Sequence, residues 1–413
     1  MPIPSPEHLK KAEAMAIDLN ALRAHFPSLG HGLAFFDGPG GTQTPRPVAD
    51  AIAETLTGPL SNRGVVSRSE LNAERAVSDF RAAYADLLNV PAEGVVHGRS
   101  ATQLTYDFSR HLAKGWKAGD EIVLSRLDHD SNVRPWVQAA ERAGVTVRWI
   151  DIDGGSTELD LDSFERALSP RTRLVAVTAA SNVLGTKPPL RHIADRAHEV
   201  GALVYVDGVH YAAHHLVDVP ALGADLFVCS PYKFLGPHCG VLAAAPELLE
   251  IIHPDKLAPS PDTVPERFEF GTLPYEVLAG ATAAVVFLAA LDPGAGGTRR
   301  EWLAHSLASL HEHERALRTR LEEGLSALGD AVTLHSKAAD RTPTLLMTIE
   351  GRDARDAQVH LAARDVLAPA GSFYAYETFT ALKLESPALR VGLAPYNSAD
   401  DVDRFLDGLA SFL

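Results

Sequence analysis

A carboxylate and an amine each follow an apolar run near the middle of the chain. Asp207 comes directly after Leu203–Val206, and Lys233 lies a few residues past Leu226–Val228. Both runs are too short for helices and are rich in Val, Tyr and Phe, which is typical of buried parallel strands. In open α/β sheets, ligands bind beyond the carboxyl ends of the strands. The sequence therefore predicts that Asp207 and Lys233 share a binding site at one edge of a sheet.

This pair of residues suits the chemistry of pyridoxal phosphate. That cofactor needs a lysine amine that bonds to it covalently, and an acid that keeps its pyridine nitrogen protonated so that the ring accepts electrons. Lys233 lies in the tight turn Ser230–Pro237, where a lysine without a function would cost free energy unless it formed an ion pair. Asp207 alone could simply cap a turn. Because the two residues follow successive strands, we interpret them as the lysine and the acid of a cofactor site.

Further polar residues follow other strands of the same predicted sheet. His129 comes after the strand expected at 121–124, where it could stack on a flat cofactor and move protons, or simply be solvated. Asn182 comes after the strand expected at 173–178, where it could bond to the cofactor ring or form an Asx turn. Ser100 joins a brief strand to a helix N-terminus, a position that binds anions, although an N-cap explains a serine there equally well.

Two patterns concern substrate and metal binding. Arg390 lies near the start of a late strand and could bind a substrate carboxylate through two hydrogen bonds. His129 stands between two aspartates, but no second cluster of His, Cys or carboxylates in the sequence has ligand spacing. The residues alone therefore leave the role of Arg390 open and predict no metal site.

Strands and helices alternate regularly from residue 94 to residue 245. This alternation predicts a three-layer α/β/α sandwich around a mostly parallel sheet of about seven strands. The expected strands are 94–97, 121–124, 145–152, 173–178, 203–206, 226–228 and 240–245. Between them, helices are expected at 103–113, 133–143, 161–168 and 190–201.

The best domain boundary is the glycine- and proline-rich break at 292–297. Residues 36–292 are expected to form a large cofactor-binding domain. Residues 298–413 are expected to form a small α+β domain, which the N-terminal segment 1–35 joins. Within the large domain, the stretch 246–275, rich in proline and polar residues, is expected to run over the surface.

Composition excludes several classes of partner. The 413 residues carry a formal net charge of −15 and no basic cluster, so nucleic acid and anionic membranes are poor partners. No apolar run approaches the ~20 residues that span a bilayer. The two cysteines exclude a disulfide framework and suit a reducing cytosol. Because the N-terminus also lacks the pattern of a signal peptide, we expect a cytoplasmic protein.

Taken together, the motifs resemble the class V aminotransferase group of fold type I pyridoxal phosphate enzymes, in particular its cysteine desulfurase-like branch. The resemblance rests on Ser181–Thr186, Val206-Asp207-Gly208 and Ser230-x-x-Lys233-x-x-Gly236-Pro237, in that order, and runs from Phe35 to Asp403. It implies pyridoxal phosphate as cofactor, a small α-amino acid as substrate, and a homodimer with the active site at the interface.

The resemblance also assigns roles to single residues. Lys233 matches the lysine bonded to the cofactor, Asp207 the partner of the pyridine nitrogen and Arg390 the arginine that binds the substrate carboxylate. His129 matches the histidine stacked on the ring and Asn182 the asparagine near its oxygen. The predicted phosphate contacts are Ser100, Ala101, Ser230 and Thr272, the last reaching across from the second subunit. Further candidates are Tyr232 and His210, which replace the family's histidine and glutamine beside the cofactor, and Asn62 and Arg63 for substrate binding.

One departure from the family bears on the reaction. Where desulfurases carry a nucleophilic cysteine in a Gly-x-x-Cys-Ala segment, this chain has Tyr374 in Gly371–Ala375, and a phenol cannot form a persulfide. Cys229 and Cys239 are expected to be structural. The leading prediction is a β-elimination of the C–S lyase type, with Lys233 as base and Tyr374 as acid for the leaving group.

Other functions stay open at this point. Transamination and epimerisation use the same first steps, and the missing cysteine also fits a pyridoxal phosphate-binding protein that has lost its chemistry. A nicotinamide-binding fold is weaker, because no Gly-x-Gly-x-x-Gly follows an expected strand.

Overall fold

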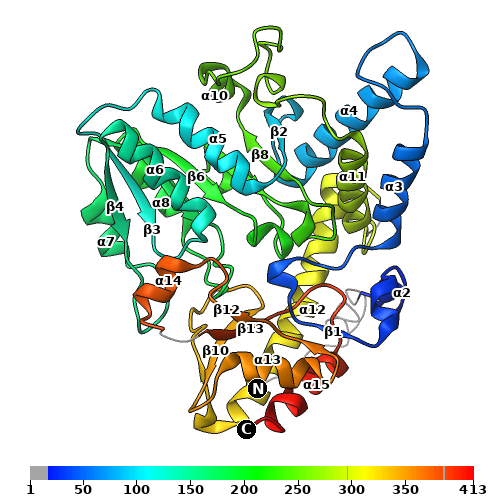
Figure 1. Ribbon diagram of the computed structural model, residues 1–413, viewed down its shortest axis with the longest axis vertical. Coiled ribbons are helices and arrows are strands. Elements are labelled where there is room, and N and C mark those ends of the chain that lie inside the picture. The colour runs from blue at the N-terminus through cyan, green and yellow to red at the C-terminus, as the bar shows by residue number, and fades with distance from the viewer. Residues whose placement is uncertain (1–16, 295, 385–386) are drawn as a thin grey trace.

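The computed structural model describes residues 17–294, 296–384 and 387–413. Its largest element is a seven-stranded sheet with the strand order β2-β8-β7-β6-β5-β3-β4 (Figure 1). The strands are β2 (Val95–Gly98), β3 (Glu121–Ser125), β4 (Thr146–Ile150), β5 (Thr172–Thr178), β6 (Leu203–Asp207), β7 (Leu226–Cys229) and β8 (Gly240–Ala244). Strands β3 to β7 pair in parallel, and β8 is antiparallel to both of its neighbours. The predicted mostly parallel sheet of about seven strands is confirmed.

Helices cover both faces of this sheet because its central strands are apolar on both sides. All residues of β3 and β7 are buried, as expected for strands that pack against helices above and below. One core lies between the sheet and the helices α4 (Arg68–Leu88), α7 (Leu161–Ala167), α8 (Leu190–Glu199) and α11 (Tyr275–Ala289). A second core lies on the opposite face, against α5 (Ala101–Ala113), α6 (Arg134–Ala143) and α10 (Pro246–Ile251).

A smaller sheet forms the lower part of the molecule in Figure 1. Its order is β12-β13-β10-β9, and every pairing is antiparallel. The strands are β9 (Val332–Leu334), β10 (Thr344–Ile349), β12 (Ala370–Gly371) and β13 (Ala388–Gly392). They share a core with the helices α12 (Arg299–Ala327), α13 (Ala354–Ala362) and α15 (Ala399–Ala410).

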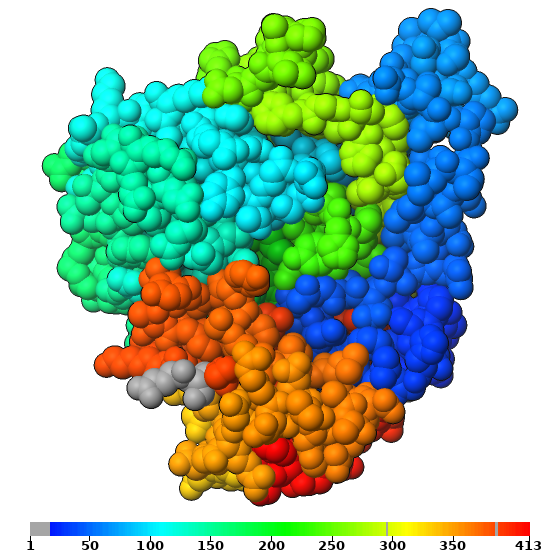
Figure 2. Space-filling view, viewed as in Figure 1, coloured from blue at the N-terminus to red at the C-terminus, as the bar shows by residue number. Residues whose placement is uncertain are grey.

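Short elements connect the two sheets. The parallel pair β1 (Ala34–Phe35) and β11 (Val366–Leu367) brings the N-terminal part of the chain to the smaller sheet. The remaining α-helices among the described residues are α2 (Leu19–Ala24), α3 (Arg46–Thr57), α9 (Val219–Leu222) and α14 (Tyr376–Ala381). In Figure 1, α14 lies between the two sheets, and Figure 2 shows this orange segment filling the seam between them on one face of the molecule.

Several expected boundaries differ from the structure. The stretch 246–275, expected to run over the surface, begins with α10, because Pro246 at the first helical position has a fixed φ that favours a helix start. The two-residue strand β11 was not expected, since so short a run carries no periodicity. Within the N-terminal segment 1–35, residues 1–16 lie outside the described residues, and the remainder includes α2 and β1. None of the described helices is long and apolar enough to cross a membrane.

Candidate active site

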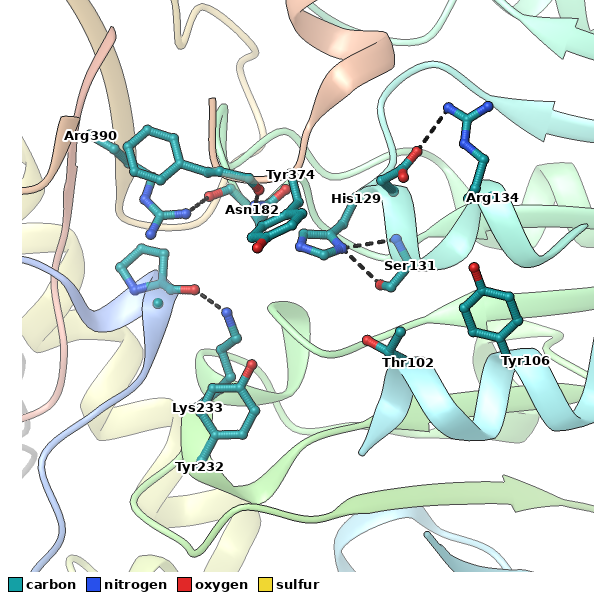
Figure 3. A pocket seen from close by; sticks show the side chains of 14 residues that line it. Thr102, Tyr106, His129, Ser131, Arg134, Asn182, Tyr232, Lys233, Tyr374 and Arg390 are labelled. Atoms are coloured by element: carbon teal, nitrogen blue, oxygen red, sulfur yellow. Dashed lines mark hydrogen bonds and ion pairs between the residues drawn. The ribbon is translucent and has the colours of Figure 1, made fainter. Parts of the chain in front are cut away.

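A cavity of about 490 Å³ lies where loops of the larger sheet meet the smaller sheet (Figure 3). It adjoins a narrower cavity of about 70 Å³ at the carboxyl ends of the parallel strands. His129 follows β3, Asn182 follows β5, Asp207 ends β6 and Lys233 follows β7. Because these strands run in parallel, their carboxyl ends meet at one edge, and all four residues line the narrower cavity.

Asp207 is a buried carboxylate at the floor of the narrower cavity. Its Oδ1 accepts a hydrogen bond from the backbone N–H of Val209 at 2.9 Å. Burial raises the pKa of Asp207 to about 6, although this hydrogen bond and the Lys233 charge oppose the rise. The backbone leaves β6 through Gly208, where an added Cβ would overlap the ring of Phe227. Only glycine therefore lets the chain turn directly after this acid.

Lys233 is a buried amine on the short 3-10 helix η6 (Pro231–Lys233). Its Nζ donates a hydrogen bond to the backbone carbonyl of Pro39, as Figure 3 shows. Burial and, to a lesser extent, the charge of Arg390 lower the pKa of Lys233 to about 7, while Asp207 opposes the shift. A lysine of this pKa is a competent nucleophile and base near neutral pH.

His129 and Asn182 lie on the side of the cavity opposite Lys233 in Figure 3. The His129 Nδ1 accepts a hydrogen bond from the Ser131 N–H at 3.1 Å and lies 2.8 Å from the Ser131 hydroxyl. Burial lowers the pKa of His129 to about 4, so its ring is neutral at pH 7. The Asn182 side chain donates from Nδ2 to the carbonyl of Phe373 at 3.0 Å.

Arg390 brings a buried positive charge from β13 of the smaller sheet. Its Nη1 donates to the backbone carbonyl of Asn182 at 3.0 Å, and its Cζ lies 3.9 Å from the centre of the Phe373 ring. Burial lowers the pKa of Arg390 to about 9, against the opposing charge of Asp37. Within the described residues, Arg390 Nε has no hydrogen-bond partner. The guanidinium therefore retains a donor for an anionic ligand.

The structure brings most of the predicted site residues together. The narrower cavity is lined by the predicted residues Ser100, Ala101, His129, Asn182, Asp207, His210, Ser230, Tyr232 and Lys233. Tyr374 and Arg390 line the larger cavity, together with His129, Asn182, Tyr232 and Lys233. The imidazole of His210 lies within hydrogen-bond distance of two hydroxyls of the smaller sheet region, Thr342 at 2.9 Å and Thr344 at 3.0 Å from Nε2.

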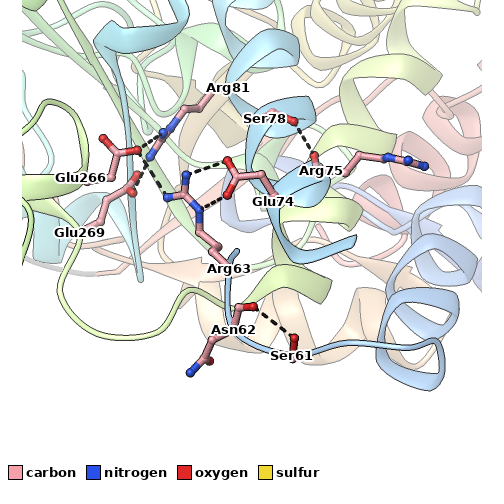
Figure 4. A network of polar contacts seen from close by, with 9 residues as sticks. All are labelled: Ser61, Asn62, Arg63, Glu74, Arg75, Ser78, Arg81, Glu266 and Glu269. Carbon is pink, nitrogen blue, oxygen red and sulfur yellow. Dashed lines mark hydrogen bonds and ion pairs between the residues drawn. The ribbon is translucent and has the colours of Figure 1, made fainter. Parts of the chain in front are cut away.

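Three predicted residues lie elsewhere in the single chain. Thr272 is exposed and lines a separate cavity together with His97 and Cys239. Arg63 forms a bidentate ion pair with Glu74, at 2.9 Å for each hydrogen bond, and Asn62 points away from this network in Figure 4. Their roles in phosphate and substrate binding stay predictions.

Sequence reasoning missed several residues that line the larger cavity. These are Pro39, Gly40, Thr102, Tyr106, Asp130, Ser131, Arg134 and Phe373. Thr102 and Tyr106 are four residues apart on α5 and so share one helix face. That spacing was a usable signal once Ser100 had been placed before the helix. Arg134 and Phe373 carried no such signal, because their positions depend on contacts between distant segments.

The buried polar atoms fit the predicted cofactor. Among the described residues, Asn182 Oδ1 and His210 Nδ1 are buried without a hydrogen-bond partner, although both residues line the narrower cavity. Buried polar atoms are normally satisfied, so these two are available to the polar substituents of a ring placed beside Asp207 and Lys233. In the part of the chain that the structure describes, no group of three or more His, Cys, Asp or Glu side chains could hold a metal ion.

Comparison with known proteins places this chain in a family. The family model described as "Aminotransferase class-V" matches residues 34–405. An aminotransferase-like protein of Gibberella zeae is 31% identical over 96% of this chain and 99% of its own length. A probable cysteine desulfurase of Mycobacterium leprae is 31% identical over 95% of this chain and 96% of its own. The crystal structure of the cysteine desulfurase CsdA of Escherichia coli superposes with a TM-score of 0.84 at 25% identity, covering 95% of this chain and 98% of that one.

Proposed function

Since this chain belongs to the class V aminotransferase family and is a pyridoxal phosphate-dependent enzyme, we propose that it catalyses β-elimination on a small α-amino acid, as a C–S lyase does. The observation that carries the proposal is the position of Tyr374. Its side chain lines the cavity that also contains Lys233 and Arg390, and its hydroxyl points into that cavity in Figure 3. A tyrosine there can donate a proton to a departing group.

The cysteines support elimination rather than persulfide formation. The chain has only two, and both are buried: Cys229 lies within β7, and Cys239 lines the separate cavity that contains Thr272. Burial raises the pKa of Cys239 to about 12 and that of Cys229 well above its usual value. Because the thiolate is the reactive form, neither residue is suited to take sulfur from a substrate at Lys233.

Each residue of the site has a separate role in the proposed reaction. When bound, pyridoxal phosphate supplies an electron sink for the negative charge that develops at the substrate α-carbon, and Asp207 holds the ring nitrogen protonated. Arg390 binds the substrate carboxylate through paired hydrogen bonds. The amine of Lys233 removes the α-proton as general base, which its pKa of about 7 permits near neutral pH. Tyr374 gives its proton to the group that leaves the β-carbon.

The test is a visible absorption spectrum of the purified enzyme during mixing with L-amino acids, including cysteine and S-substituted cysteines. We expect a visible band that shifts and returns while pyruvate and ammonia accumulate. A lasting loss of the band with release of a keto acid would replace elimination by transamination, and loss of optical activity without pyruvate would replace it by epimerisation. If no band forms on adding pyridoxal phosphate, the roles of Lys233 and Asp207 are wrong.

We further propose the assembly that the resemblance implies. Members of this family act on amino acids and are typically dimers, and we place the site at the interface of a cytoplasmic homodimer. In that dimer Thr272 reaches the phosphate site of the second copy. A sedimentation measurement that finds a monomer at full activity would overturn the shared site.

We also assign 36–292 and 298–413 to two domains, with 1–35 joining the smaller one.

A further inference from the structure

We propose that Phe373 is a positioning residue for the substrate carboxylate. Its ring holds the guanidinium of Arg390 in one plane, and Asn182 holds the backbone segment that carries this ring. This proposal rests on the proposed function in one respect only, the binding of a substrate carboxylate by Arg390. The segment that follows β12 and lines the cavity thereby has a second role, positioning Arg390, which is separate from the proton donation proposed for Tyr374.

The backbone of this segment is in an unfavourable conformation. Phe373 and Tyr374 both have a φ of 54°, in the left-handed region that L-residues other than glycine rarely adopt. Two such residues in succession persist only where the surrounding structure holds them. The segment leaves the edge strand β12, which pairs with β13 at Gly371↔Ala388, and therefore starts beside the strand that carries Arg390.

Polar groups of the larger sheet hold both residues. Asn182 Nδ2 donates to the Phe373 carbonyl at 3.0 Å, and the backbone N–H of Asp130 donates to the Tyr374 carbonyl at 2.7 Å. A third hydrogen bond, from the Ala375 N–H to the Ser372 carbonyl at 2.9 Å, closes the turn itself. The strained conformation is therefore tied to the same loops that carry His129 and Asn182 into the site.

The result of this conformation is a stacked contact. The Phe373 ring centre lies 3.9 Å from Arg390 Cζ, and only 4% of Arg390 is exposed. A cation over an aromatic face is held more strongly when it is desolvated. A carboxylate binds a guanidinium through the N–H groups in its plane. Stacking on the face therefore fixes the plane of Arg390 and leaves its in-plane donors for the ligand.

Asn182 links the two contacts. Its backbone carbonyl accepts from Arg390 Nη1 at 3.0 Å, while its side chain holds the Phe373 carbonyl. The guanidinium is thus fixed by one hydrogen bond at its edge and by one ring on its face, and both depend on a single residue of the larger sheet. This arrangement holds the guanidinium of Arg390, which belongs to the smaller sheet, at a fixed position relative to Lys233.

The test compares two ligands that differ only in the carboxylate. 2-Methylalanine has no α-proton and cannot undergo elimination, and isopropylamine is the same molecule without its carboxylate. Their dissociation constants are measured by absorption titration of the loaded enzyme. Phe373→Ala should weaken 2-methylalanine binding about tenfold to thirtyfold, the loss of one desolvated cation–π contact, and should leave isopropylamine binding unchanged. Phe373→Tyr keeps the ring and should bind both ligands as the wild type does.

The same titrations decide against the proposal if the carboxylate is not involved. Equal changes for both ligands, or an unchanged constant for 2-methylalanine in Phe373→Ala, would overturn it, as would failure of the wild type to bind 2-methylalanine. Phe373→Gly removes the ring but relieves the positive φ, so it should melt at a higher temperature than Phe373→Ala and bind 2-methylalanine equally weakly. Failure of the elimination proposal is seen separately, as absence of pyruvate from S-substituted cysteines.

Discussion

Replacing Tyr374 by phenylalanine removes one oxygen atom and nothing else from the proposed reaction. The side chain is 77% exposed, and the backbone carbonyl that accepts from Asp130 is unaffected by the change. The ring contact with His129, at 5.6 Å between centroids, also stays. We therefore expect a change in unfolding free energy within about 0.5 kcal/mol, as for other surface substitutions, and unchanged cofactor binding.

The expected loss of activity depends on the leaving group. Proton transfer by a positioned side chain contributes about 10²- to 10⁴-fold to a rate, or about 3 to 5 kcal/mol of transition-state stabilisation. A methanethiolate leaving from S-methylcysteine is basic and benefits from this proton. Chloride leaving from β-chloroalanine is not basic and gains nothing from it. Tyr374→Phe should therefore lower kcat about 10²- to 10⁴-fold for S-methylcysteine and less than about threefold for β-chloroalanine.

Pyruvate release from the two substrates is the assay, with wild type and Tyr376→Phe measured alongside. Tyr376 is a matched control because it is also an exposed tyrosine, 61% exposed, and begins α14 two residues further on, where it lines a different surface groove. The same loss on both substrates would show that Tyr374 acts through structure. An unchanged kcat for S-methylcysteine would remove Tyr374 from the mechanism, and with it the observation that carries the proposed reaction.

Three further changes test Asp207, the glycine that follows it, and a buried pair that does not line either cavity. Affinity for pyridoxal phosphate should fall as pH drops through about 6, because burial raises the pKa of Asp207 to about 6 and only its ionised form pairs with a protonated ring nitrogen. Absorption titrations at several pH values check this expectation. Asp207→Asn should bind the cofactor weakly at every pH. Gly208→Ala should destabilise the protein by about 1–3 kcal/mol in thermal unfolding, since its Cβ overlaps the Phe227 ring; an unchanged melting temperature would contradict the packing argument. Glu314→Ala should lower the free energy of unfolding by about 1–3 kcal/mol, because it removes the buried partner that lies 2.9 Å from His214. Glu314→Gln should lower it less, and a calorimetric scan of both variants measures the difference.

The larger sheet could be predicted because its signals are local. Short apolar runs marked each parallel strand, and polar residues such as Asp207 and Lys233 followed them at the edge where parallel strands end. The smaller sheet was harder to resolve, since its edge strand β12 has two residues and no periodicity. Phe373 lies within the segment Gly371–Ala375 but was not identified as a site residue. Its importance comes from a positive φ and a contact with Arg390, and both depend on distant segments.

The division between the two sheets explains why the reaction is the hardest property to predict from sequence. Asp207 and Lys233 are fixed by the register of parallel strands, with Asp207 opposite Thr178 on one side and Val228 on the other. Tyr374 instead extends from the end of the edge strand β12, on a turn whose conformation hydrogen bonds to Asp130 and Asn182 maintain. A substitution at this turn can therefore change what happens at the substrate β-carbon while the cofactor stays bound. That separation is why cofactor binding and leaving-group dependence must be measured independently in the same variant.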